Sequence, residues 1–208
     1  MNTSTRTPTL LLSLLATTTA LADSSVQLAV QGALTPSACV VLLSKNGIID
    51  LGRIPAKSLN KDEFTVLPSQ ILELNVTCGS PTLYALVGMD NRADSSLAPG
   101  FFYGLGKNIH APVERLGSVA FSYRNPVGDG QAVQPLASSN NGASWFPEPN
   151  AYPRNYMAFA QPGAIVPRPL TRLDTLVRID TSINAAMYLT LDQEVPLDGS
   201  ITLDLRYL

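Results

Sequence analysis

Short runs of alternating apolar and polar residues recur along most of the chain and predict β-strands. Side chains at successive strand positions point to opposite faces, so such runs indicate strands that are buried on one face. Most of the sixteen prolines and fourteen glycines lie between the runs, where they are typical of turns. The predicted strands are 33–43, 71–78, 83–89, 116–123, 156–160, 173–180, 186–191 and 200–207. Helical periodicity is nearly absent, so the pattern favours an all-β fold, an antiparallel β-sandwich.

Two of the runs show which side chains should enter the core. One predicted face carries Leu72, Leu74, Val76 and Cys78, and another carries Val119, Phe121 and Tyr123. The stretch 125–154 contains Asn-Asn-Gly and Pro-Glu-Pro and predicts a long surface insertion, and 162–169 predicts an irregular connection. The chain shows no internal repeat and no linker, which indicates one domain.

Both ends of the chain carry an alternating stretch. The C-terminal stretch has one apolar face, made of Ile201, Leu203, Leu205 and Tyr207. The N-terminal stretch has another, made of Val26, Leu28, Val30 and Leu34. An apolar strand at a chain end must have its edges covered, either by its own sandwich or by another chain. Periodicity alone leaves both interpretations open for each end.

The first 22 residues have the pattern of a signal peptide. Arg6 precedes an apolar stretch at 10–15, and Ala20-Leu-Ala22 supplies a small-residue cleavage site. The apolar stretch is too short to span a bilayer. We therefore expect export and a mature chain of 186 residues, enough for one domain with a core.

Charge and cysteine content narrow the classes of partner and site. Without its first 22 residues the chain has 13 basic and 16 acidic residues and no basic tract, which argues against nucleic acid as a partner. With only 14% charged residues, either neighbouring molecules cover much of the surface or the surface is plainly polar. After export, Cys39 and Cys78 predict a structural disulfide, since no Cys-x-x-Cys occurs and His110 is the only histidine.

No motif predicts catalysis, a metal site or a cofactor. A triad needs a nucleophile, a base and an orienting group in reach, and His110 has no companion. Asp90 and Asp94 either hold calcium or a sugar or, as we favour, form a strand-end turn closed by Asx side chains. The three aromatic residues in and beside the proline-rich insertion either stack on a sugar ring or, as we favour, attach the insertion to the sandwich. They are Trp145, Tyr152 and Tyr156.

Several stretches resemble the chaperone–usher pilus (fimbrial) subunits. The segment 32–39 resembles the start of those subunits, in which an N-terminal extension leads into a first strand that carries the first disulfide cysteine. The segment 70–78 ends on the second cysteine, and Tyr207 matches their penultimate tyrosine. More narrowly, three stretches are similar to a fimbrial-type family catalogued as a domain of unknown function. They are 50–59, 87–93 and 102–106.

The resemblance implies an incomplete immunoglobulin-like antiparallel β-sandwich that is completed by a donor strand from another chain. It implies a signal peptide at 1–22, a donor-strand extension at 23–31 and a pilin-type domain at 32–208. The apolar face of Val26, Leu28, Val30 and Leu34 would be the donor. The strand of Ile201, Leu203, Leu205 and Tyr207 would line the acceptor groove and contact the chaperone.

The function expected from this resemblance is that of a structural subunit of a bacterial surface fimbria that contributes to adhesion. Its partners would be a periplasmic chaperone, an outer-membrane usher and neighbouring subunits, with a host or surface glycan as a further ligand. It would travel through the periplasm to the cell surface. The competing interpretation is a monomeric secreted carbohydrate-binding module or adhesin, which requires a complete sandwich.

Overall fold

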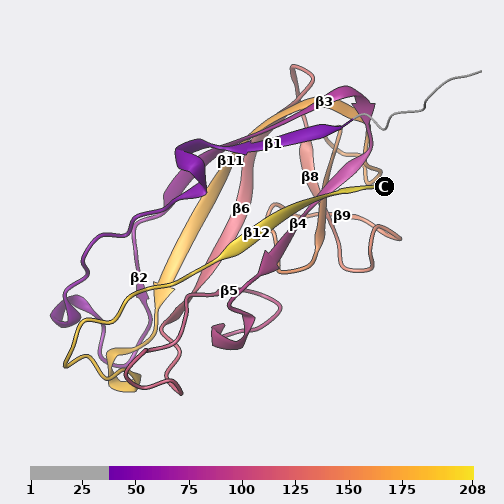
Figure 1. Cartoon of the computed structure of the whole chain (residues 1–208). Helices are drawn as coiled ribbons and strands as arrows, with labels where there is room; N and C mark the ends of the chain where they lie inside the picture. Colours follow the sequence, from indigo (N-terminus) through magenta and orange to yellow (C-terminus); the bar gives the residue numbers. More distant parts are fainter. Residues whose placement is uncertain (1–37) are drawn as a thin grey trace, which may run out of the picture. The chain divides into compact units, whose positions relative to one another are not determined.

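The computed structural model describes residues 38–208, which form two antiparallel β-sheets packed against each other (Figure 1). The larger sheet has the order β1 (Cys39–Leu43), β3 (Gln70–Thr82), β11 (Leu170–Ile183), β6 (Gly117–Gly128) and β5 (Tyr103–Gly104), with β2 (Thr65–Val66) beside β11 and β7 (Gln131–Ala132) beside β6. The smaller sheet has the order β12 (Ile201–Tyr207), β4 (Tyr84–Asp90), β10 (Tyr156–Ala160), β8 (Gln134–Ser138) and β9 (Phe146–Pro147). The predicted all-β sandwich is confirmed.

The helices of the described part of the chain are short 3₁₀ turns. They are η1 (Ser44–Gly47), η2 (Ala56–Ser58), η3 (Ala93–Ser95) and η4 (Ala186–Tyr188). Between residues 38 and 208 no helix has the length and apolar character needed to cross a membrane.

The strand predicted at 186–191 is wrong, because this stretch begins with η4. The backbone N–H groups of Ala186 and Met187 donate to Asn60 O and Lys61 O, each at 2.9 Å. Met187 and Tyr188 are both more than half exposed. These two adjacent side chains would point to opposite faces of a strand. Because both are exposed, the stretch lacks the single buried face that a half-buried strand requires.

The surface insertion predicted at 125–154 is only partly correct. It contains the end of β6 and the whole of β7, β8 and β9. β8 lies between β10 and β9 in the smaller sheet, and its residues Leu136 and Ala137 are fully buried. Dense turn residues on both sides hide this short strand in the sequence. The connection at 162–169 is irregular, as predicted.

The core between the sheets contains the predicted faces of β3 and β6. Leu72, Leu74, Val76 and Cys78 are each at most 4% exposed, and the side chains of Val119, Phe121 and Tyr123 are also buried. Aromatic rings continue this core across both sheets, with centroids 5.1 Å apart for Tyr103–Phe121 and 5.5 Å for Tyr123–Phe159. Gly88 permits this packing, since a Cβ there would lie 2.1 Å from the Tyr103 hydroxyl.

The predicted disulfide is confirmed and joins two neighbouring strands. Cys39 and Cys78 are directly opposite each other in the β1–β3 register, and their sulfur atoms are bonded. The bridge attaches the short edge strand β1, which has only five residues, to the long strand β3. It therefore holds one edge of the larger sheet in place.

We predict that Cys39→Ser lowers the free energy of unfolding by about 4 kcal/mol, because the bridge closes a loop with a sequence separation of 39 residues. Denaturant titration of the oxidised wild type and the variant measures this difference. Reduction of the wild type provides the matched control and should give the same loss. Equal stability of the oxidised and reduced wild type would contradict the prediction.

Candidate strand-binding groove

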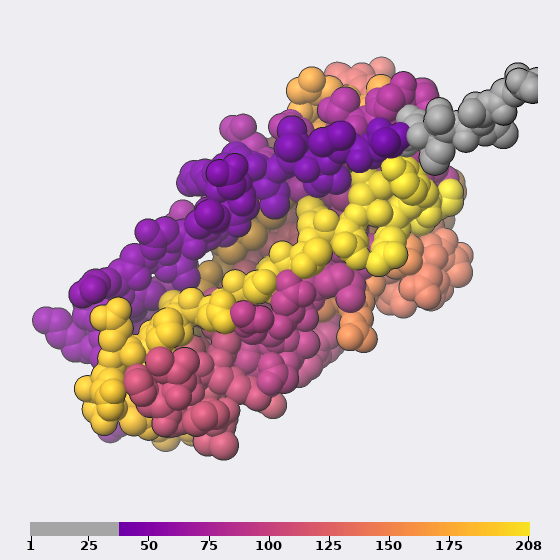
Figure 2. Space-filling model, viewed as in Figure 1, coloured from indigo at the N-terminus to yellow at the C-terminus, as the bar shows by residue number. Residues whose placement is uncertain are grey.

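A groove runs between two walls (Figure 2). One wall is β1 and the segment that follows it, and the other is β12 and the segment that precedes it. β1 and β12 are both edge strands: within residues 38–208, β3 is the only strand paired with β1, and β4 is the only strand paired with β12. The free backbone edge of a strand is a template for pairing with another strand. The groove therefore lies between two edges that can both bond to an inserted strand.

A left-handed turn makes one wall of this groove. Lys45 and Asn46 both have φ of 53°, and Gly47 has φ of 71°. The Ser44 hydroxyl accepts a hydrogen bond from the N–H of Glu73 at 2.8 Å, at the point where pairing with β3 stops. The turn directs the chain away from the sheet edge, so that Ile49 and Leu51 line the groove and the segment does not extend β1.

The floor of the groove consists of side chains of the sandwich core. These are Leu72, Val119, Phe121, Val177 and Ile179, from β3, β6 and β11. Each keeps 4% to 9% of its surface exposed, whereas Leu74, Val76 and Leu86 are fully buried. The floor of the groove is thus the apolar core itself, with at most 9% of each of these side chains exposed.

The groove encloses about 230 Å³ and continues into a second chamber of about 500 Å³. Ile49, Leu51 and Leu197 line both. The second chamber lies between the segment 49–59 and the segment 189–197, and its apolar base includes Leu116 and Ile183. The cavity is therefore elongated, as an extended peptide requires.

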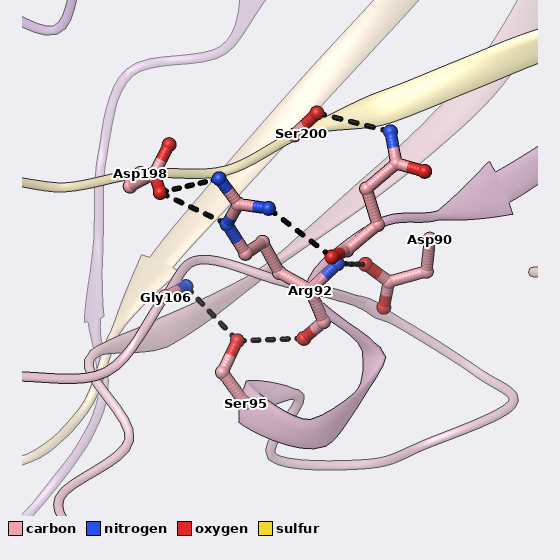
Figure 3. A network of polar contacts seen from close by, with 7 residues as sticks. Asp90, Arg92, Ser95, Gly106, Asp198 and Ser200 are labelled. Atoms are coloured by element: carbon pink, nitrogen blue, oxygen red, sulfur yellow. Dashed lines mark hydrogen bonds and ion pairs between the residues drawn. The ribbon is translucent and has the colours of Figure 1, made fainter. Parts of the chain in front are cut away.

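A polar network holds the beginning of the β12 wall (Figure 3). The guanidinium of Arg92 donates two hydrogen bonds to Asp198 Oδ2, at 2.9 and 2.6 Å. Asn91 Nδ2 donates to the hydroxyls of Ser200 and Thr202, both at 3.0 Å. These contacts join the segment before β12 and the start of β12 to the turn after β4. They therefore hold this part of the β12 wall in place.

The same network depends on Asp90. Its carboxylate accepts the N–H of Arg92 and the N–H of Gly104, each at 2.8 Å. Ser95 extends the network by donating to Arg92 O at 2.7 Å and accepting from Gly106 N at 2.9 Å. Asp90 thus closes an Asx turn, the interpretation favoured from the sequence, while Asp94 pairs with Lys107.

We predict that Asp90→Ala lowers the free energy of unfolding by about 2 kcal/mol, because it leaves two partly buried N–H groups without their acceptor. The exposed Arg92–Asp198 pair contributes less, so Arg92→Ala should cost about 1 kcal/mol or less. Denaturant titration measures both. Asp204→Ala, in the exposed pair with Arg206, is the control, and an equal loss for Asp90→Ala and Asp204→Ala would refute this role for Asp90.

The four residues predicted to line the acceptor groove all lie on β12, but only two of them line the groove. Ile201 and Leu203 line it. Leu205 packs against the core and is not part of the groove lining. Tyr207 is 54% exposed, and its hydroxyl accepts a hydrogen bond from Cys39 N at 3.1 Å. A side chain from the smaller sheet therefore bridges to the larger sheet at that end of the groove.

The predicted donor residues cannot be placed against this groove. Val26, Leu28, Val30 and Leu34 lie outside the described residues, and so does the predicted signal peptide. Their assignment as a donor strand stays a prediction.

The sequence interpretation missed the wall residues Ile49, Leu51 and Leu197. They lie in irregular segments, after β1 and before β12, where alternation of apolar and polar positions does not apply. A weak signal exists in the apolar positions Ile49, Leu51, Ile54 and Leu59, which recur through a stretch without strand or helix periodicity. Such a stretch indicates side chains that pack from a loop.

The other candidate chemistry of the described residues has structural explanations. No group of three or more His, Cys, Asp or Glu side chains between residues 38 and 208 is placed to hold a metal ion. Tyr152 packs edge to face against Phe101 with centroids 6.0 Å apart, and Tyr156 is part of β10. Trp145 lies against Gly142, where a Cβ would be 3.3 Å from its ring. Trp145 and Tyr152 thus pack against different neighbours, and neither packs against the other.

Glu114 ties two loops together at the second chamber. Its carboxylate accepts the N–H and the hydroxyl of Thr190, each at 2.7 Å, and Asn108 Nδ2 at 2.8 Å. These hydrogen bonds, above all the one from the backbone of Thr190, lower the pKa of Glu114. A depressed folded-state pKa stabilises the fold above the unfolded pKa and this stabilisation is lost as the pH falls through the folded value.

We therefore predict that wild-type stability falls more steeply than that of Glu114→Gln as the pH drops below about 4.3, the ordinary pKa of Glu. Denaturant titrations of both proteins across this acid range test the difference. A direct NMR titration of the Glu114 carboxyl is the second measurement. Titration at or above the ordinary value would show that the Thr190 hydrogen bonds do not hold the charged form.

Comparison with known proteins gives one matching family model and two relatives. Residues 28–111 match the model of a family described as a protein of unknown function, DUF1120. This range includes the stretches 50–59, 87–93 and 102–106. Protein GltF of Escherichia coli (strain K12) is 25% identical over 235 aligned residues, with 89% of each chain covered. The uncharacterized protein YhcF of the same organism is 25% identical over 224, covering 90% of this chain and 92% of its own. The chain is thus similar to two Escherichia coli proteins over most of its length.

Proposed function

We propose that this chain is a structural subunit of a bacterial surface fimbria that polymerises by donor-strand exchange. The observation that carries the proposal is the apolar groove between β1 and β12, whose floor is the core of the protein itself. A groove between two unpaired edges is suited to one ligand shape above others, an extended strand.

The N-terminal stretch has the properties that this groove requires. Its alternation from Val26 to Leu34 spans nine residues, or about 30 Å as a strand. Each of its four large apolar side chains contributes roughly 1.5–3 kcal/mol on burial, a gross gain of about 10 kcal/mol. Ordering the free segment offsets part of this gain. The remainder is sufficient to hold a non-covalent polymer together.

The other steps follow from the same open groove. Until a neighbouring subunit fills it, the exposed core must be covered, which is the role of a periplasmic chaperone that lends a strand. An outer-membrane usher then exchanges that strand for the extension of the next subunit at the cell surface. The predicted signal peptide at 1–22 supports export by this route.

We predict that Val30→Asp abolishes assembly while leaving the chaperone complex intact, because it places a charge on the apolar donor face. Gln31→Asp, on the opposite face, is the matched control and should assemble. Expression in the periplasm with a chaperone and usher, followed by measurement of surface polymer, compares the two. Equal polymer from both variants would disprove the assigned donor face.

The monomeric alternative is tested by expression without any chaperone. A subunit with an open groove should be recovered poorly, because the free edges of β1 and β12 can pair with other chains and aggregate. A good yield of stable monomer, unaffected by deletion of residues 23–31, would overturn the proposed function and favour a monomeric secreted binding module.

A further inference from the structure

The two ends of the groove differ, and this limits how a strand can enter. At one end, called here the disulfide end, β1 begins and β12 stops, next to the C-terminus (Figure 1). There the Tyr207 hydroxyl accepts the Cys39 N–H, so a side chain crosses the groove. At the opposite end, the mouth end, the walls meet through Arg53 and Glu194, 3.7 Å apart with side chains 91% and 80% exposed. Such an exposed pair opens at little cost.

A donor strand that enters from the mouth end brings its own sandwich close to that end. Only four residues separate Leu34, the last apolar donor position, from Cys39 at the start of β1. Extended chain covers at most about 3.5 Å per residue, so the two positions lie within about 18 Å. The donor's disulfide end must then face the acceptor's mouth end.

The mouth end presents apolar side chains on three segments that are bonded to one another. Met187 N donates to Lys61 O at 2.9 Å, and Asn108 Nδ2 donates to Thr190 O at 2.8 Å, which joins 60–65, 107–115 and 186–194. The exposed side chains there are Phe64, Ile109, Val113, Met187 and Tyr188, all at least 56% exposed. A surface held in this way loses little conformational freedom on binding.

The disulfide end presents apolar side chains of its own. The connection between β10 and β11 carries Ile165 and Val166, which are 60% and 70% exposed. Pairing of Leu170 with Thr82 places this connection beyond Cys78, at the disulfide end. Gln134 holds it, donating to Ala164 O at 2.7 Å and accepting from Gly163 N at 3.0 Å.

We propose that these two surfaces bind each other in consecutive copies of this chain, head to tail, beside the inserted strand. The proposal rests on the proposed function, because the short connection to the donor strand is what brings the two ends together. Different surfaces on the two partners make a heterologous contact, which repeats along a filament and does not close a two-fold dimer. Burial of exposed apolar side chains drives it.

The test uses multimers of the full mature chain, assembled with chaperone and usher. Val113→Glu and Met187→Glu alter the mouth end, and Val166→Glu alters the disulfide end. Ile71→Glu is the control, because Ile71 is 43% exposed on β3 and pairs with Arg178 between the two ends of the larger sheet. Sedimentation velocity after dilution measures the rate at which subunits are released.

We expect each end variant to release subunits about tenfold faster than the wild type, the effect of losing one good apolar contact. The control should match the wild type. Wild-type release rates in all three end variants would overturn the contact and leave strand exchange standing. An effect from one end alone would overturn the pairing of the two surfaces. A wild-type chain that forms no multimers would overturn both this contact and the proposed function.

Discussion

The apolar core between the two sheets forms the floor of a groove that no strand of residues 38–208 fills, and most other features of the structure relate to this. β1 and β12 lie on either side of that groove, in different sheets, each with one free backbone edge. The hydrophobic effect favours covering the floor between them, and backbone hydrogen bonding favours covering both edges. A single extended strand satisfies both requirements at once, which no globular ligand does.

Local interactions keep the two walls apart. The left-handed turn at Lys45–Gly47 carries the chain off the edge of β3, and the contacts of Arg92 with Asp198 fix the other wall to β4. At the disulfide end, the bridge between Cys39 and Cys78 fixes the β1 wall to β3, and the hydrogen bond from Cys39 N to the Tyr207 hydroxyl connects the two walls. The groove is thereby closed at one end and weakly held at the other. Under the proposed function, this asymmetry would give an inserted strand a direction.

Much of the fold could be predicted because a strand that is buried on one face shows a regular alternation of apolar and polar residues in the sequence. In β3 the buried residues are every second one from Leu72 to Cys78, and β10 matches its predicted range. The predictions were wrong where this link was absent. β8 is short and lies among turn residues, and 186–191 alternates without a buried face because η4 bonds to residues 60 and 61. Loop residues such as Leu197 line the groove without any periodic signal.

The sequence by itself determined the class of fold, the strand faces and the disulfide pair, because each depends on side-chain alternation or on the presence of only two cysteines. Only the tertiary structure decided that β1 and β12 are the edges that flank an open core, since strand order depends on contacts between residues far apart in the chain. It also decided that Tyr207 bridges one end of the groove. A penultimate tyrosine at the end of an alternating strand carries no sign in the sequence that its hydroxyl meets Cys39, 168 residues away.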